Sequence, residues 1–227
     1  TQEPSGPKQR YWHDFFNYAG IHRPVWLSVV PEKRIEDVTV VTAFDGADGI
    51  IRYTASATGE GRIVAEAYDA DGALAARSDS GELRIPNVHP WAPAEGYLYH
   101  VQFSLLTDGR LQDTYPLRVG VRTVRIQGSK ILVNDKPVYL KGFGMHEDIE
   151  VLGKGHNDAY MLHDFELLKW IGANSFRTSH YPYSEDVMDL ADEQGFLVID
   201  ETPAVGLNLV NGGIFPGADM KTFSPDT

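Results

Sequence analysis

The sequence predicts a multidomain protein in which an all-β sandwich is followed by the start of an α/β domain with a parallel sheet. Between about residues 32 and 124, short runs rich in Val, Ile, Tyr and Thr alternate with turn sequences, as in an antiparallel sandwich. From about residue 138 onward, apolar runs of strand length alternate with stretches of helical periodicity, as in βαβ units. An aromatic-rich stretch, residues 11–27, precedes both parts.

The overall composition limits the class of protein. The chain has 227 residues, of which 42% are hydrophobic and 23% charged, so it can bury a core and is not a disordered chain. Its net charge is 20 − 32 = −12, which disfavours nucleic acid and anionic membrane surfaces as partners. No apolar run approaches the ~20 residues of a membrane span. The absence of Cys excludes disulfides, and no Asn-x-Ser/Thr sequon occurs, so cytoplasmic and secreted locations both stay open.

The first stretch to interpret is the aromatic-rich segment 11–27, which contains Asp14. It is too short to form a core of its own. We therefore expect it to form the closing strands of a domain whose earlier part is absent from the sequence. Asp14 is either a satisfied structural charge or part of a site.

The next part shows the strand and turn signals of a sandwich. Asp71-Gly72 and Asp108-Gly109 predict hairpin turns, because both residue types tolerate positive φ. Trp91, between Pro90 and Pro93, is expected to pack at a corner between strands. We expect no catalytic group in this part. The predicted strands are Val38–Phe44, Gly49–Ala57, Arg62–Tyr68 and Tyr97–Leu106.

The remaining sequence predicts two hairpin turns and then three parallel strands separated by two helices. The first helix is capped by Asn157 or Asp158 and ends at Gly172. Ser184 caps the second helix and Gly195 stops it. The turns lie around Gly128 and at Asn134–Pro137. The parallel strands are Val138–Phe143, Ala173–Arg177 and Phe196–Ile199, and the apolar face of the first helix comprises Met161, Leu162, Phe165, Leu168, Trp170 and Ile171.

Three parallel strands are too few for a closed β/α barrel, which needs eight strands and about 250 residues. The sequence therefore represents either an open α/β fold or a segment of a longer protein. The incomplete first part and the irregular stretch after Glu201 favour the segment.

Polar residues gather where each predicted parallel strand ends. His146 follows the first strand, Arg177 and His180 end the second, and Asp200 and Glu201 end the third. In a β/α barrel these strand ends form the active-site face. The alternative is an ordinary α/β domain whose strand ends are polar.

The kinds of chemistry that these groups support are limited. No fixed metal-ligand spacing is present, so we expect no metal, and no cofactor is implied. Ser179 lacks the Gly-x-Ser-x-Gly context of a nucleophile elbow. Asp200 and Glu201 are adjacent on a strand and face opposite ways, so they cannot form the carboxyl pair of a glycosidase. Carbohydrate binding fits the surrounding aromatic residues, Trp12, Phe15, Tyr181 and Tyr183.

The motifs around these strand ends resemble glycoside hydrolase family 2. The resemblance is carried by the run from Asn174 to Pro182, together with Val187-Met188, Asp192, Gly195 and Phe196–Ile199. It covers nearly the whole chain, including Pro90-Trp-Ala-Pro93 and Gly96-Tyr-Leu-Tyr99. The stretches that resemble the β-glucuronidase branch of this family are 13–23, 115–120, 142–148 and 170–174.

The resemblance implies three domain segments. Residues 1–29 correspond to the end of an N-terminal sugar-binding jelly roll, and residues 30–125 to an immunoglobulin-like β-sandwich. Residues 126–227 correspond to the first three βα units of a TIM (β/α)8 barrel, which is incomplete here.

The resemblance also implies an activity, the hydrolysis of β-D-glucuronides with retention of configuration. In that family the acid/base Glu follows an Asn after the fourth barrel strand, and the nucleophilic Glu lies near the seventh. Neither segment is in this sequence, nor is the segment with the Asn-x-Lys pair that holds the glucuronate carboxylate. No catalytic residue is therefore expected among these 227 residues, which alone should be inactive.

The site residues implied by the resemblance belong to the periphery of the sugar pocket. Asp14, His180 and His146 match positions that contact the sugar. Arg177 and Glu201 are expected to support the site, Arg177 by ordering carboxylates at the barrel mouth.

The partners that follow are a glucuronide, small or part of a glycan, and further copies of the full-length enzyme in a homo-oligomer, a dimer or tetramer. The alternatives are a β-galactosidase or β-mannosidase of the same family, or a non-catalytic carbohydrate-binding module.

Overall fold

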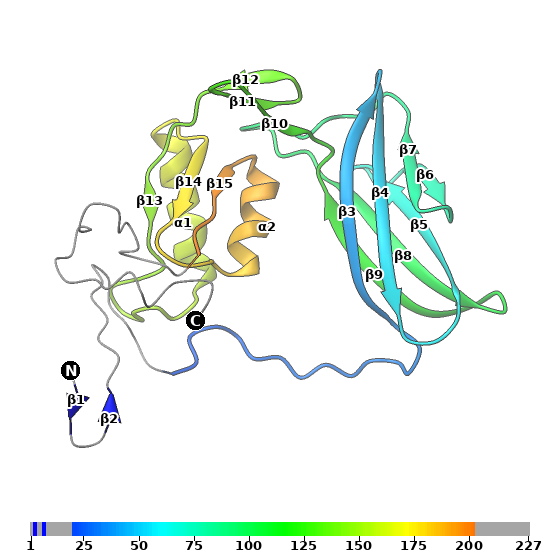
Figure 1. The fold of residues 1–227 in the computed structure, drawn as a ribbon, viewed down its shortest axis with the longest axis horizontal. Helices are drawn as coiled ribbons and strands as arrows, with labels where there is room; N and C mark the ends of the chain where they lie inside the picture. The colour runs from blue at the N-terminus through cyan, green and yellow to red at the C-terminus, as the bar shows by residue number, and fades with distance from the viewer. Residues whose placement is uncertain (1, 4–5, 8–19, 203–227) are drawn as a thin grey trace.

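The structure, a computed structural model, describes residues 2–3, 6–7 and 20–202. Figure 1 shows a β-sandwich (residues 35–119), a small antiparallel sheet (124–138) and an α/β part (144–199), which follow one another along the chain. Near the N-terminus, β1 (Gln2–Glu3) and β2 (Gly6–Pro7) pair antiparallel. No helix among the described residues is long and apolar enough to cross a membrane.

The sandwich consists of two antiparallel sheets, and its predicted strands are confirmed. One sheet has the order β3 (Ile35–Asp45), β4 (Asp48–Ala57), β7 (Glu82–Ile85). The other has the order β6 (Leu74–Ser78), β5 (Arg62–Tyr68), β8 (Tyr99–Thr107), β9 (Arg110–Val119). This 3 + 4 arrangement is that of an immunoglobulin-like domain.

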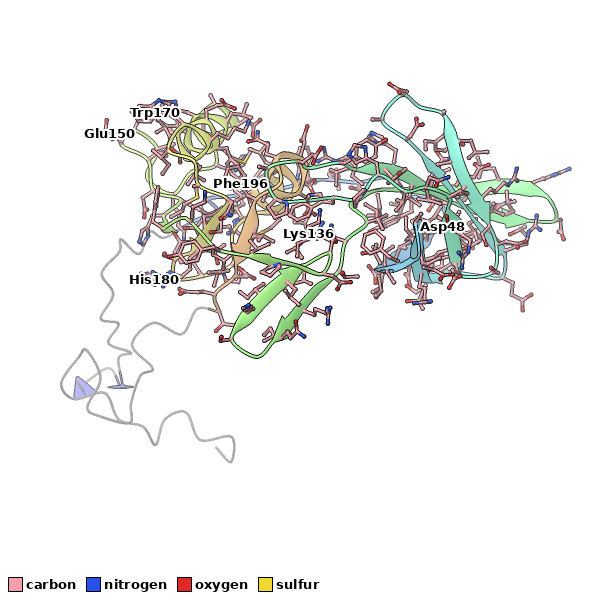
Figure 2. The ribbon with its side chains drawn as sticks, turned by 90° about the horizontal axis from the view of Figure 1, so that it is seen from above. Asp48, Lys136, Glu150, Trp170, His180 and Phe196 are labelled. Atoms are coloured by element: carbon pink, nitrogen blue, oxygen red, sulfur yellow. The ribbon has the colours of Figure 1, made fainter. Side chains whose placement is uncertain are left out.

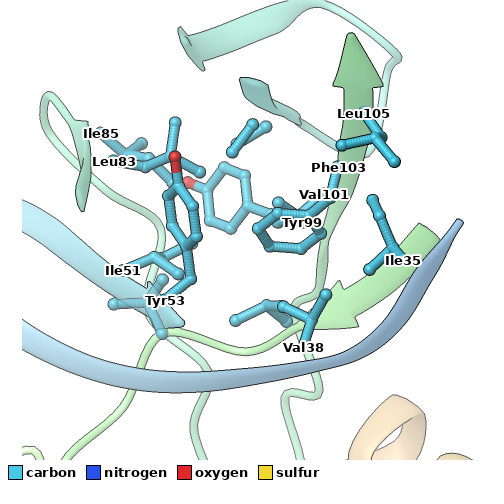
Figure 3. Packing of buried hydrophobic residues seen from close by; sticks show 14 residues of the cluster. Ile35, Val38, Ile51, Tyr53, Leu83, Ile85, Tyr99, Val101, Phe103 and Leu105 are labelled. Atoms are coloured by element: carbon cyan, nitrogen blue, oxygen red, sulfur yellow. The ribbon is translucent and has the colours of Figure 1, made fainter. Parts of the chain in front are cut away.

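The sandwich core lies between the inner faces of the two sheets, as Figure 3 shows. In β8, Val101 and Phe103 are buried while His100 and Gln102 are exposed, the alternation of a strand with one face inward. The Phe103 ring meets that of Tyr53 edge-on, with ring centroids 5.0 Å apart. Apolar burial of this kind supplies most of the stability of the sandwich.

The predicted turns are confirmed by backbone geometry. Asp108 and Gly109, between β8 and β9, both have positive φ (51° and 77°), as a two-residue hairpin turn requires. Asn134 and Asp135 likewise have positive φ (50° and 63°) in the turn of the small sheet. This sheet comprises β10 (Val124–Gln127), β11 (Lys130–Val133) and β12 (Lys136–Val138).

The α/β part is a parallel sheet of three strands with two crossover helices, as predicted. The strand order is β13 (Gly144–Met145), β14 (Ser175–Thr178), β15 (Leu197–Ile199), with α1 (Asp158–Trp170) and α2 (Glu185–Gln194) between them in sequence. Asn157 caps α1 and Ser184 caps α2, each by accepting a bond from a first-turn N–H. Gly195 ends α2 with φ 75°.

The position of the first parallel strand differs from the prediction. Val138 belongs to the antiparallel β12, residues 139–143 form no strand, and the parallel pairing is assigned to β13. Asn174 also contacts this segment through its side chain, whose amide donates to the carbonyl of Tyr139 and accepts from the N–H of Lys141. Backbone N–H groups of Asn174 and Ser175 donate to the carbonyl of Lys141, and that of Arg177 donates to the carbonyl of Phe143. The segment therefore runs beside β14 as predicted, but regular pairing begins only at Gly144.

Two further predictions were wrong in part. The closing strands were expected in residues 11–27; residues 11–19 lie outside the described residues, and no strand is assigned in residues 20–27. On α1, only Phe165 and Leu168 are buried, because the helix presents one narrow stripe to the sheet. Trp170, which is 82% exposed, lies outside this stripe together with Leu162 and Ile171.

The sandwich and the α/β part meet at Trp91, which is buried, as expected for a corner residue. Its indole Nε1 donates to the backbone carbonyl of Asp192 on α2 at 2.6 Å. The guanidinium of Arg122 lies 4.4 Å above the Trp91 ring and pairs with the Asp192 carboxylate at 2.9 Å. Gly96 lies so close to α2 that a Cβ there would stand 2.1 Å from the carbonyl oxygen of Glu193. The parts are therefore in close contact.

Candidate functional site

The polar residues predicted at the strand ends come together on one edge of the parallel sheet. Gly144 of β13 pairs with Arg177 of β14, and Arg177 pairs with Ile199 of β15. Because this register aligns the carboxyl ends of the strands, the residues that follow each strand share one edge. Figure 2 shows His180 at the side of the α/β part opposite Trp170 and far from Asp48 in the sandwich.

Three of the predicted residues form one connected group at this edge. The Nδ1 atom of His180 lies 3.3 Å from Oε2 of Glu201. The other carboxylate oxygen of Glu201 accepts a bond from the guanidinium of Arg177. Since a carboxylate only accepts, the first bond requires the proton on Nδ1 of His180. Glu201 thus fixes the ring orientation and tautomer of His180, and Arg177 fixes Glu201.

His146 joins this group from the neighbouring strand end. Its ring lies edge-on to that of His180, with centroids 5.3 Å apart, and its Nδ1 is 3.9 Å from the carboxylate of Asp148. The His180 side chain is 16% exposed and that of His146 37%. Both side chains are therefore partly exposed, and their rings lie together at the strand ends.

Thr178 is a residue of this edge that the sequence reasoning missed. Its side chain is fully buried. Its hydroxyl donates to Oδ1 of Asp200 at 2.8 Å and accepts from the backbone N–H of Glu201 at 2.8 Å. Asp200 and Glu201 therefore bond to different side chains, and Thr178 sets the course of the chain that carries Glu201. Its position at the end of a strand was the only available signal.

The tyrosines expected to line a sugar are instead part of the core. Tyr181 and Tyr183 are 7% and 6% exposed, so their rings cannot stack on a sugar from outside. The hydroxyl of Tyr183 bonds to the backbone carbonyls of Met145 and Ser179, which ties the turn after β14 to β13. Burial raises the pKa of Tyr181 to about 12 and raises that of Tyr183 further.

A cavity of about 50 Å³ lies next to this edge, lined by residues of the loop 145–157, of α1 and by Arg23. Asp164 of α1 lines it, and burial raises the pKa of that carboxyl. Lys154 also lines it and places its Nζ 3.2 Å from the Tyr181 ring centroid. A space of this size holds water but no sugar ring. His146 also lines this cavity, which therefore adjoins the edge at His180.

Three of the residues expected to contact the sugar are not described by the structure. Asp14, Trp12 and Phe15 lie outside the described residues. Among the residues that the structure describes, no three His, Asp or Glu side chains lie close enough together to hold a metal ion. The pairing of Arg23 with Glu147 was not predicted, yet the two form an ion pair at 3.3 Å beside the His180 turn. Nothing local in the sequence signals this pair, because its members are far apart in the chain.

Comparison with known protein families gives two adjoining matches. Residues 33–122 match the family "Glycosyl hydrolases family 2", and residues 124–225 match "Glycosyl hydrolases family 2, TIM barrel domain". The first match covers the sandwich and the second the small sheet and the α/β part. The sandwich is thus followed by the start of a TIM barrel, as the sequence predicts.

Individual proteins similar to the chain include several β-glucuronidases. The chain is 44% identical over 230 residues to β-glucuronidase of Paenibacillus borealis, covering 99% of this chain and 38% of that protein. It is 44% identical over 205 residues to β-glucuronidase of Rattus norvegicus, covering 86% of this chain and 32% of that protein. The chain thus spans about a third of the length of these curated relatives.

The fold is similar to that of solved structures. The crystal structure of Ruminococcus gnavus β-glucuronidase matches with a TM-score of 0.83 and 45% identity, over 86% of this chain and 34% of that one. The same enzyme in complex with D-glucuronic acid matches with a TM-score of 0.83, over 85% of this chain and 34% of that one.

Proposed function

This chain belongs to glycosyl hydrolase family 2, and from that premise we propose that it forms the sugar-binding periphery of a retaining β-glucuronidase. The observation that carries the proposal is the shared edge on which three parallel strand ends gather His146, His180 and Glu201. The similarity to β-glucuronidases, one of them solved with D-glucuronic acid, supports the choice of substrate.

Each residue of the edge has a proposed role. His180 donates or accepts a hydrogen bond at a sugar hydroxyl, with its ring held by Glu201. His146 approaches the same sugar from β13. Arg177 neutralises Glu201, so that the carboxylate orients His180 without repelling an anionic substrate. This local cation lets a chain of net charge −12 take part in binding a uronic acid.

The bond-breaking groups belong to the full-length protein outside these 227 residues. Retaining glycosidases need two carboxyl groups about 5–5.5 Å apart, one as acid/base and one as nucleophile. At the described edge Glu201 is engaged by Arg177 and His180, and Asp200 by Thr178. These bonds suit supporting residues better than a proton-transferring pair.

The remaining assignments complete the proposal. Asp14 reaches the sugar from the N-terminal part of the chain. The domain limits are 1–29 for the end of a jelly roll, 30–125 for the immunoglobulin-like sandwich and 126–227 for the start of the barrel. The full-length enzyme is a homo-oligomer, a dimer or tetramer, which sedimentation equilibrium at several concentrations tests.

The test of the function compares three aryl glycosides with the full-length protein. We expect turnover of the β-D-glucuronide and little turnover of the matched β-D-galactoside and β-D-mannoside, with the β-anomer as the first product by NMR. Faster hydrolysis of the galactoside or the mannoside would show that the protein is a β-galactosidase or a β-mannosidase of the same family. Binding without any turnover would favour a carbohydrate-binding module.

A further inference from the structure

Residues 22 and 23 attach the segment that precedes the sandwich to the α/β part. The backbone N–H of His156 donates to the carbonyl of His22 at 3.1 Å. The Nη2 atom of Arg23 donates to the carbonyl of Pro182 at 2.7 Å and lies 3.3 Å from Oε2 of Glu147. Its neighbours make little contact: Ile21, Val25, Trp26 and Leu27 are 75–97% exposed. The attachment is therefore polar and concentrated at these two residues.

Glu147 extends this attachment to the start of α2. Its side chain is 14% exposed. Its Oε1 lies 3.4 Å from the backbone N–H of Ser184, the residue that caps α2. Arg23 and Glu147 together thus hold Pro182 and Ser184, the two ends of a short turn that begins two residues after His180.

This turn determines where the His180 ring stands. On its inner side the hydroxyl of Tyr183 bonds to the carbonyls of Met145 and Ser179. On its outer side, Arg23 and Glu147 hold the chain just after His180. A site residue must be held within about 0.5 Å of its productive geometry by such contacts. Removing Arg23 would leave the Pro182 carbonyl and the partly buried Glu147 carboxylate without this cation.

We propose that Arg23, paired with Glu147, is a positioning residue that fixes the His180 turn of the barrel to the segment entering from the N-terminal domain. The effect on catalysis rests on the proposed function. The consequence is that the sugar site is set jointly by two domains, through a polar contact between residues 124 positions apart.

The test uses the full-length protein with Arg23→Gln, Glu147→Gln and the double variant. We expect each single variant to raise KM for an aryl β-D-glucuronide about tenfold with a smaller change in kcat. The double variant should resemble the singles, because either change breaks the same pair. Arg23→Lys keeps the charge but not the planar guanidinium, so it should fall in between. The matched control is Arg52→Gln, whose 3.0 Å ion pair with Glu82 lies in the sandwich.

Hydrogen–deuterium exchange separates this inference from the function itself. Arg23→Gln should speed exchange in residues 180–184 and leave the sandwich strands unchanged. The inference would be overturned if Arg23→Gln kept both the wild-type KM and the wild-type exchange rates in these residues. It would also be overturned if the increase in KM of the double variant equalled the product of the increases in the two single variants. If the wild-type protein hydrolyses no glucuronide, the proposed function fails and the exchange result alone decides whether Arg23 positions the turn. Should Arg23→Gln not fold, Glu147→Gln and Arg23→Lys give the same readouts.

Discussion

The Nδ1 atom of His180 lies 3.3 Å from Oε2 of Glu201, although 21 residues separate the two in the chain. The contact forms because β14 and β15 are parallel and in register, which brings the residues after each strand to one edge. Glu201 in turn accepts from Arg177. The orientation of one imidazole is therefore controlled by a carboxylate and a guanidinium from two strand ends.

Replacing Glu201 by Gln should weaken substrate binding. The neutral amide loses the ion pair with Arg177 and no longer requires the proton on Nδ1 of His180. We expect KM of the full-length enzyme for an aryl β-D-glucuronide to rise about tenfold. Glu82→Gln, which removes an exposed carboxylate of the sandwich, is the matched control. An unchanged KM would show that Glu201 does not orient the site.

Tyr183→Phe should destabilise the α/β part. The change removes a buried hydroxyl that bonds to the carbonyls of Met145 and Ser179 and leaves both without this donor. We expect a loss of about 1–2 kcal/mol in the free energy of unfolding, measured with urea. Tyr139→Phe, at an 82% exposed position, should change stability by much less. Equal effects of the two substitutions would contradict the role given to the Tyr183 hydroxyl.

Buried tyrosines should make the protein less stable in alkali. Burial raises the pKa of Tyr181 from 10.0 to about 12. A raised folded-state pKa contributes stability that is complete below the unfolded pKa near 10 and is lost as the pH rises toward 12. Urea unfolding between pH 8 and 11 should show this decline, and Tyr181→Phe should reduce its slope. If Tyr181→Phe leaves the pH dependence of the free energy of unfolding unchanged, a group other than Tyr181 causes the decline.

Gly96→Ala should loosen the junction between the sandwich and α2. The added Cβ would lie 2.1 Å from the carbonyl oxygen of Glu193, a backbone atom that cannot move aside alone. We expect a loss of about 2–4 kcal/mol, seen as a lower Tm in calorimetry. Gly155→Ala is the milder control, since its nearest contact would be at 3.1 Å. Similar Tm values for both variants would mean that moving the sandwich away from α2 at Gly96 costs little stability, which contradicts this prediction.

Local signals in the sequence predicted much of the fold. The caps at Asn157 and Ser184 and the stop at Gly195 act within a few residues, so residue type alone reveals them. The turn at Asp108-Gly109 is predictable for the same reason. The start of the first parallel strand was misplaced because Val138 pairs instead with Ile131 in the small antiparallel sheet, a contact that the apolar pattern of residues 138–143 does not reveal.

The site could be predicted only as far as strand ends and motifs reveal it. His146, His180 and Glu201 follow strands, Arg177 lies near the end of β14, and all four meet at one edge. Tyr181 and Tyr183 carry the same aromatic signal as sugar-stacking residues, and only the three-dimensional packing shows that they are buried. The Arg23–Glu147 pair depends on a contact across 124 positions, which no periodicity or local motif encodes.

The measurement that tests the central claim most directly is the Kd of D-glucuronic acid, determined by calorimetry for the full-length protein and its His180→Ala variant. We predict that the wild type binds the sugar and that the variant binds it about tenfold more weakly, as the loss of one hydrogen bond in the site implies. Equal Kd values, or no binding by the folded wild type, would contradict the claim that this edge binds a glucuronic acid.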